Sequence, residues 1–174
     1  RHKRPVLEAR FDELSDADLA AIEPDSVAWW NARNDVHGGD WRTWPDPLPE
    51  PDARTTRLAR FHQWLQSLVA DQLAEVRATG VRIIGDLAVG FSPGGADGWE
   101  YRDVVSHDMR MGAPPDAFNP AGQDWGIPPF IPWRLRAAGY RPFIDTVRAA
   151  LRGVDALRID HVMGLFRQYW VPVG

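Results

Sequence analysis

The clearest pattern in the chain is a set of hydrophobic residues spaced three and four apart between residues 56 and 79. Its members are Leu58, Phe61, Leu65, Leu68, Val69, Leu73 and Val76. This spacing predicts an amphipathic helix, which we expect to be capped by a threonine at its start and ended by Gly80. Residues 81–89 follow as a nearly continuous apolar run containing one acid, Asp86, and predict a buried strand.

The order of helix, glycine and strand returns toward the C-terminal end. Apolar residues between Phe143 and Leu151 predict a second amphipathic helix, with Pro142 in its first turn and Gly153 after its end. Residues 154–160 then predict a second strand, in which Leu157 and Ile159 alternate with Arg158 and Asp160. Because each helix leads into its strand through a single glycine, we expect an α/β fold with the two strands parallel.

Residues 90–141, between the first strand and the second helix, are rich in glycine and proline. A loop of this length is either functional or disordered. Its aromatic residues argue against disorder; they include Trp99, Tyr101, Phe118, Trp125, Phe130 and Trp133. We expect these side chains to order the loop, and the loop to lie over a site at the carboxyl ends of the strands.

Residues 1–55 show no strand pattern and are expected to form an N-terminal helical and irregular segment that packs on residues 56–174. Ser15 begins a short helix that Pro24 stops, and residues 25–32 predict a second helical piece. Residues 34–53 are predicted to be an irregular surface segment whose two tryptophans need something to pack on. Residues 1–10 have no clear period.

The composition narrows the class of function. The formal net charge is −4, cysteine is absent and no apolar run is long, so we expect no nucleic-acid surface, thiol chemistry or membrane span. The lack of cysteine fits a cytoplasmic protein, and the chain opens on no signal-peptide pattern. Nine tryptophans favour a sugar ligand, because flat amphipathic rings stack on sugars, although tryptophan is also an ordinary core residue.

The candidate chemistry lies at the strand ends. Arg158 and Asp160 are two residues apart, so their side chains project to the same side of the second strand. Asp86 is near the end of the first strand, and α/β enzymes carry their sites at such ends. Structural Arg–Asp pairs are common, so these residues alone favour a structural ion pair. A metal site of Asp86, Asp160 and His161 is a weaker alternative, because no spaced pair of histidines accompanies them.

Five short segments carry a resemblance to a known family. They are Ile84-Gly85-Asp86-Leu87, Ala96-Asp97-Gly98-Trp99, Gly112-Ala113-Pro114-Pro115-Asp116-Ala117-Phe118-Asn119, Gly122-Gln123-Asp124-Trp125-Gly126 and Arg158-Ile159-Asp160-His161. In this order they resemble the amylomaltases, the 4-alpha-glucanotransferases of glycoside hydrolase family 77, and particularly actinobacterial forms. The likeness runs from about Trp41 to Gly174. It implies a partial (β/α)8 TIM barrel of the α-amylase type, with helical and irregular insertions.

The resemblance also implies an activity and roles for individual residues. The activity is transfer of α-1,4-glucan segments, or maltooligosaccharides, to a glucose-type acceptor with retention and without a cofactor or metal. Asp160 matches the nucleophile, and Arg158 matches the residue that orients it and keeps it ionised. The residues implied to contact substrate are His161, Asp86, Asp97, Trp99, Asp116, Phe118, Gln123 and Trp125. For Trp99 and Trp125, plain packing is an equally good interpretation.

The chain departs from the family in ways that bear on activity. Ile127-Pro128 stands where the family usually has Asn-Pro, and Gly95 and Gly98 stand where many members have Ser and Val. A retaining transfer needs a carboxylic acid besides the nucleophile, and no residue here matches the family's acid/base Glu or its stabilising Asp. We therefore expect the chain to carry the nucleophile half and to be inactive alone. The alternative is a non-catalytic sugar-binding or scaffold fragment.

Overall fold

The structure is a computed structural model that describes residues 3–174. The chain divides into two compact units, one up to Gln72 and one from Leu73. The long helix α4 (Ala53–Ala78) contributes to both. The expected boundary near residue 55, and the packing of the N-terminal segment on the rest, stay predictions.

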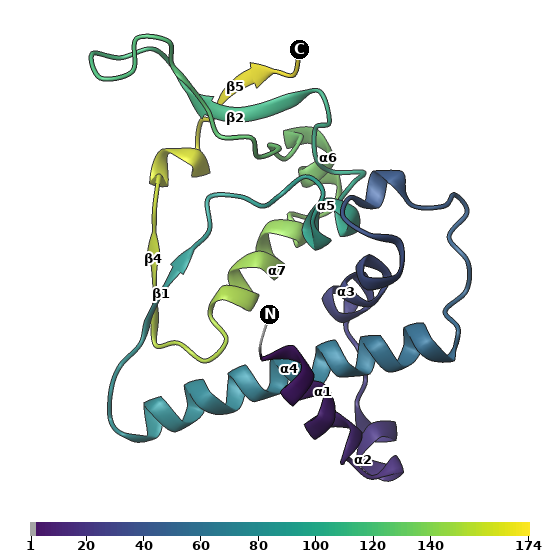
Figure 1. The fold of residues 1–174 in the computed structure, drawn as a ribbon. Helices are drawn as coiled ribbons and strands as arrows, with labels where there is room; N and C mark the ends of the chain where they lie inside the picture. The colour runs from purple at the N-terminus through teal and green to yellow at the C-terminus, as the bar shows by residue number, and fades with distance from the viewer. Residues whose placement is uncertain (1–2) are drawn as a thin grey trace. The chain divides into compact units, whose positions relative to one another are not determined.

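The N-terminal unit is helical (Figure 1). It contains α1 (Arg4–Asp12), α2 (Asp16–Ala21), α3 (Ser26–His37), the 3-10 helix η1 (Trp41–Thr43) and most of α4. The two predicted short helices are α2 and α3, and the Ser15 side chain caps α2 by accepting a hydrogen bond from the Asp18 backbone N–H. Helix α1 covers residues for which the sequence showed no clear hydrophobic period. Arg4 and Glu8, which are one helical turn apart, form an ion pair at 2.7 Å on this helix.

The core of the N-terminal unit is largely aromatic. The Phe11 ring packs edge-on against Phe61 with ring centroids 5.3 Å apart, and tilted against Trp64 at 5.5 Å. Trp44, from the irregular segment, is buried and lies against Trp30 at 5.9 Å. The expectation that this segment's tryptophans need a packing partner is confirmed for Trp44.

Helix α4 begins at Ala53, slightly before the predicted start. The sequence had predicted a threonine as the cap of this helix, but the cap is Asp52. The Asp52 carboxylate accepts hydrogen bonds from the backbone N–H and the hydroxyl of Thr55, both at 2.7 Å. At the other end, Gly80 adopts a φ of 85°, which a glycine tolerates without a steric penalty.

The C-terminal unit contains the predicted pair of parallel strands. Strand β1 (Ile84–Leu87) pairs in parallel with β4 (Ala156–Ile159), and helix α7 (Arg141–Ala150) connects toward β4 and packs near β1. The prediction that β1 is buried is wrong, because Ile84 is 70% exposed and Leu87 alone in the strand is buried. The cause is the small sheet: within residues 3–174, β1 and β4 pair with each other and with no third strand.

A second sheet was not predicted. Strands β2 (Met109–Ala113), β3 (Gln123–Asp124) and β5 (Tyr169–Pro172) form an antiparallel sheet in the order β3-β2-β5. The helices α5 (Ala96–Glu100) and α6 (Pro132–Ala137) and the 3-10 helix η2 (Val162–Leu165) complete the unit. Residues 90–141 are therefore not one long loop. Their strands are hard to recognise locally, because β3 is very short and the other partner of β2, β5, lies far along the chain, after β4.

The aromatic residues order this region only in part. Phe130 packs against Phe91 at 5.6 Å and against Tyr101 at 6.4 Å, as expected. Phe118 is 92% exposed and Trp133 is also largely exposed, so the expectation is wrong for these two. Small apolar groups do much of the remaining packing, since Val105 and Met111 are buried.

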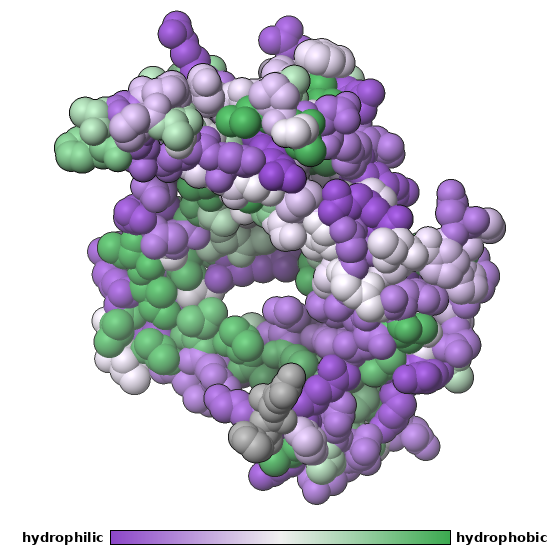
Figure 2. All heavy atoms as spheres, turned by 45° about the horizontal axis from the view of Figure 1, so that its top comes forward, coloured by the Kyte–Doolittle hydropathy of each residue, from purple (hydrophilic) through white to green (hydrophobic). Residues whose placement is uncertain are grey.

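Hydrophobic side chains stay exposed around the parallel strands (Figure 2). They include Val81, Ile84, Val89 and Ile159 on or beside β1 and β4, and Val162, Met163, Leu165 and Phe166 in the segment after β4. Exposed patches of this kind mark surfaces that bind something else. No helix in residues 3–174 has the length and apolar character needed to cross a membrane.

Candidate functional site

The charged residues at the carboxyl ends of β1 and β4 lie together. The parallel register pairs Asp86 with Arg158. The Arg158 Nε–H donates a hydrogen bond to Asp86 Oδ1, and Arg158 Nη2 lies 3.6 Å from Asp160 Oδ2. One guanidinium thus contacts both carboxylates. Arg158 and Asp160 lie side by side and Asp86 at the corresponding end of a parallel strand, as predicted.

The guanidinium at the centre of this group is held in its charged form. The hydrogen bond to Asp86 raises the pKa of Arg158, and the attraction of the Asp86 and Asp160 charges raises it further. The three side chains are 60–64% exposed, so water weakens each attraction. The arrangement therefore fixes geometry and charge sign more than it contributes to stability.

His161, directly after Asp160, has an unusual backbone. Its φ is 51° and its ψ is 51°, in the left-handed region, which is uncommon for a residue with a side chain and is often associated with functional sites. The imidazole packs edge-on against Trp125, with ring centroids 5.0 Å apart and the planes at 88°. His161 is thereby fixed both by its own backbone and by a neighbouring ring.

Trp125 is in turn held by Gln123. The indole Nε1–H donates to the Gln123 side-chain oxygen at 3.0 Å, and Gln123 belongs to β3, next to β2. Gly112 allows β3 to lie close to β2, because a Cβ at position 112 would be only 1.9 Å from the Gln123 carbonyl oxygen. The second sheet therefore carries Gln123 and Trp125 to His161, and so to the residue that follows Asp160.

Asp97 and Trp99 lie on the short helix α5. Partial burial raises the pKa of the Asp97 carboxyl, although the side chain still reaches solvent. Trp99 has the Arg102 guanidinium over its ring at 5.8 Å from the centroid. A protein contact thus already uses one face of Trp99, which supports packing as at least part of its role.

Asp116 and Phe118 lie in the connection between β2 and β3. Asp116 Oδ1 accepts hydrogen bonds from the backbone N–H of Phe118 at 2.8 Å and of Asn119 at 2.6 Å, which is the geometry of an Asx turn. The turn presents the Phe118 ring to solvent. Among the described residues, no bond or ring contact joins Asp116 or Phe118 to Asp160 or His161.

A cavity of about 670 Å³ borders Asp160 and His161. That volume lies in the range of small-molecule sites. Its walls are mainly apolar and come from the ends of β1 and β4, from α6, α7 and η2, and from the second sheet. Lining residues that the sequence had not marked as site residues include Phe91, Met111, Leu135, Tyr140, Phe143 and Trp170. They come from separate elements, so no local motif marks them.

The structure gives the metal alternative no support. Within residues 3–174, no group of three or more His, Cys, Asp or Glu side chains is arranged to hold a metal ion. The Asp86 carboxylate instead accepts a hydrogen bond from Arg158, and the His161 imidazole packs against Trp125.

Comparison with known proteins connects this geometry to a family. The sequence profile of the 4-alpha-glucanotransferases, glycoside hydrolase family 77, matches residues 9–174. The chain belongs to this family. The 4-alpha-glucanotransferase of Mycobacterium tuberculosis (strain ATCC 25618 / H37Rv) is 43% identical over 164 residues, a match that covers 86% of this chain and 23% of the relative.

Solved structures of the 4-alpha-glucanotransferase family agree. The crystal structure of amylomaltase from Corynebacterium glutamicum matches with a TM-score of 0.79 and 35% identity, over 98% of this chain and 26% of the other. The amylomaltase from Streptococcus agalactiae in complex with acarbose matches with a TM-score of 0.69 over 99% of this chain and 40% of the other; at 17% identity it supports the fold alone.

These matches confirm the amylomaltase resemblance, and the mycobacterial and corynebacterial relatives agree with the likeness to actinobacterial forms. The chain spans about a quarter of the length of both relatives.

Proposed function

We propose that this chain carries the nucleophile part of a retaining, cytoplasmic 4-alpha-glucanotransferase, which transfers α-1,4-glucan segments to a glucose-type acceptor. The observation that carries the proposal is the position of Asp160. It follows a parallel strand, contacts an Arg158 guanidinium held by a second carboxylate, and borders a ligand-sized cavity. Family membership connects this arrangement to glucan transfer.

In the proposed reaction, a carboxylate oxygen of Asp160 attacks the anomeric carbon of the donor sugar. The glycosidic C–O bond breaks, and the leaving sugar oxygen takes a proton from a carboxylic acid. The acceptor hydroxyl oxygen then displaces Asp160 from the same carbon, while the conjugate base of the acid removes the proton of that hydroxyl. Two displacements give overall retention.

Arg158 fits a positioning role in this reaction. The guanidinium has a planar set of donors that can contact two carboxylates at once. By binding Asp86, Arg158 holds a fixed place beside Asp160, with its guanidinium facing the carboxylate that would attack the sugar. Asp86 is thus already committed to an ion pair, which makes it a poor choice for the protonated acid.

The remaining residues are proposed to bind the glucan. His161 and Trp125 would contact the sugar beside Asp160, because His161 follows Asp160 in the chain and Trp125 packs against His161. Gln123, Asp97 and Trp99 would line the approach. Asp116 would hold the turn that exposes Phe118, whose ring is free to close over a sugar face.

We also propose that β1 and β4 are neighbouring strands of a (β/α)8 barrel. Their parallel register with an intervening helix is the repeating unit of such a barrel. The exposed apolar residues around them are the surface on which further barrel elements would pack. The fit to the Corynebacterium glutamicum amylomaltase supports this arrangement.

The activity is tested in a longer chain, made by joining these 174 residues to the remaining length of the Corynebacterium glutamicum enzyme. Disproportionation of maltotriose into glucose and longer products is measured. Asp160→Asn should remove nearly all activity and leave the fold unchanged by circular dichroism. Full activity in this variant would show that the nucleophile is another residue.

The 174-residue chain allows a second test that needs no acid. In a 5-fluoro-α-glucosyl fluoride the leaving group is fluoride, which departs with little acid assistance, and the ring fluorine slows release of the sugar from the enzyme. We expect mass spectrometry to find the sugar on the peptide that contains Asp160, and to find none in Asp160→Asn. Labelling of a different carboxylate would refute the assignment. Transfer between maltotriose molecules by this chain should be undetectable.

A further inference from the structure

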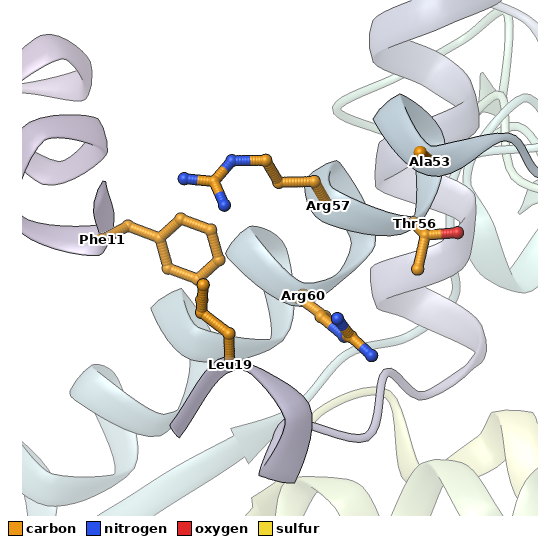
Figure 3. A pocket seen from close by; sticks show the side chains of 6 residues that line it. All are labelled: Phe11, Leu19, Ala53, Thr56, Arg57 and Arg60. Carbon is orange, nitrogen blue, oxygen red and sulfur yellow. The ribbon is translucent and has the colours of Figure 1, made fainter. Parts of the chain in front are cut away.

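The N-terminal unit contains a separate cavity of about 220 Å³ (Figure 3). It lies where α1 and α2 meet the first turns of α4. Phe11 and Leu19 contribute its wall from the short helices. Ala53, Thr56, Arg57 and Arg60 contribute from α4, at the spacing of one helix face. None of these residues belongs to the proposed transferase site.

The lining combines an apolar wall with positive charge and contains no acid. Phe11, Leu19 and Ala53 offer ring, branched and methyl surfaces, and the Thr56 hydroxyl is used by a hydrogen bond to the Asp52 carbonyl oxygen at 2.9 Å. Arg57 extends over the Phe11 ring at 5.1 Å from its centroid and pairs with Asp12. Its charge is therefore already balanced by a carboxylate outside the lining.

Arg60 is different. Its side chain is half-buried, yet within residues 3–174 the structure shows no carboxylate or carbonyl oxygen bonded to it. In Figure 3 it leaves the same face of α4 as Arg57 and points in another direction. The guanidinium donors of Arg60 are therefore available to the oxygens of an anion. By comparison, the half-buried Arg110 in the C-terminal unit pairs with Asp124 at 3.1 Å.

We propose that this cavity binds a small organic anion. Arg60 would hold the carboxylate or phosphate group, whose oxygens match the guanidinium geometry. The wall of Phe11 and Leu19 would hold an apolar or planar body. The cavity volume limits that body to about one ring. This site does not depend on glucan transfer.

The test measures binding of phenyl phosphate and benzoate to the 174-residue chain by calorimetry, with perturbation of the Phe11 ring followed by NMR. Benzyl alcohol is the neutral probe and inorganic phosphate the probe without an apolar body. We expect both aromatic anions to bind at least about tenfold more tightly than either comparison probe, as one charged hydrogen bond implies. Comparison of the affinities of phenyl phosphate and benzoate shows whether the site prefers a phosphate or a carboxylate group.

Arg60→Gln should weaken binding of the aromatic anions by about tenfold or more. The matched control is Arg54→Gln, an exposed arginine of α4 outside the lining, which removes the same charge and should change affinity less than about twofold. Ala53→Leu, which narrows the cavity, should also weaken binding. Circular dichroism checks that each variant folds.

Three results would overturn the proposal. The first is benzyl alcohol binding as tightly as benzoate, which would remove the role of charge. The second is an equal loss of affinity in Arg54→Gln and Arg60→Gln, which would indicate non-specific attraction. The third is the absence of anion binding at millimolar concentration in the folded chain.

Discussion

At the scale of single residues, Arg158 has the most consequential contacts. Its Nε–H binds Asp86 and its Nη2 lies near Asp160, which a lysine cannot reproduce because an ammonium is a point charge without a planar fork. The position of the proposed nucleophile thus depends on the shape of its neighbour as well as on the charge.

Arg158→Lys in the longer chain should therefore lower kcat for maltotriose disproportionation by roughly 10- to 100-fold, since small displacements of a reacting group are costly. KM should change less, because the substrate contacts are kept. Arg82→Lys, at an exposed arginine before β1, is the matched control. Equal activity of Arg158→Lys and the parent would contradict a positioning role.

Asp35 plays a structural part in the N-terminal unit. It pairs with Arg4 at 2.8 and 3.3 Å and accepts a hydrogen bond from His62 Nε2 at 2.9 Å, which joins α1, α3 and α4. Burial acts to raise the pKa of this carboxyl, but the hydrogen bonds from Arg4 and His62 outweigh burial, and the pKa lies below its usual value.

Asp35→Asn should lower the free energy of unfolding by about 1 kcal/mol at neutral pH, the low end for a charged hydrogen-bonded group because Arg4 is about half exposed. Because the folded pKa is depressed, this stabilisation is present above a pH of about 4 and is lost as the pH falls through the folded pKa. Urea unfolding across this range measures the effect. Asp71→Asn, an exposed acid of α4, should have little effect at any pH.

At the scale of elements, the turn after β4 and the second sheet together fix His161. The sheet presents Trp125 to one side of the imidazole. Gly164 in η2 lies on another side, where a Cβ would come within 3.2 Å of His161 Cδ2. A side chain at position 164 and the imidazole in its present place would therefore crowd each other.

Gly164→Ala should shift the His161 ring by a few tenths of an ångström and change the NMR resonances of His161 and Trp125. Backbone strain is not the cause, since the φ of Gly164 is not positive. Gly95→Ala is the matched control: its Cβ would be comparably tight, 3.3 Å from the Ser92 carbonyl oxygen, but should leave both rings unchanged. Identical spectra for Gly164→Ala and the parent would show that η2 does not position His161.

At the scale of the whole molecule, the exposed apolar surface after β4 is the feature expected to have the largest effect on association between copies of the chain. Phe166 is 81% exposed, and neighbouring residues of η2 are also exposed. The Mycobacterium tuberculosis and Corynebacterium glutamicum relatives are about four times longer, and in the proposed barrel further elements would cover this surface. Left uncovered, such a surface favours association.

The 174-residue chain should therefore self-associate at micromolar concentration, as seen by sedimentation velocity. Phe166→Ser should reduce association by removing a central apolar group. Phe118→Ser is the control, because Phe118 is even more exposed but stands alone among polar and small residues of a turn. A concentration-independent monomer would refute this expectation, as would equal effects of the two variants.

The sequence by itself determined the elements whose signal is local. The helix around residues 56–79 became α4, the second amphipathic helix became α7, and the strands around Asp86 and Arg158 became β1 and β4. The parallel pairing of the two strands followed from the order of helix, glycine and strand. This pairing predicts that Asp86, Arg158 and Asp160 lie together, because parallel strands end at the same edge of a sheet.

The tertiary structure alone decided what depends on residues far apart in the chain. Strand β2 forms because β5 pairs with it, and neither strand has enough alternation to be recognised alone. The Trp125 ring meets His161 because the second sheet carries it there. The pairing of Asp35 with Arg4 and His62, like the cavity beside Arg60, arises where separate helices pack together. Local periodicity indicates which face of a segment will be buried, whereas the residues that this face packs against are determined by the tertiary folding of the whole chain.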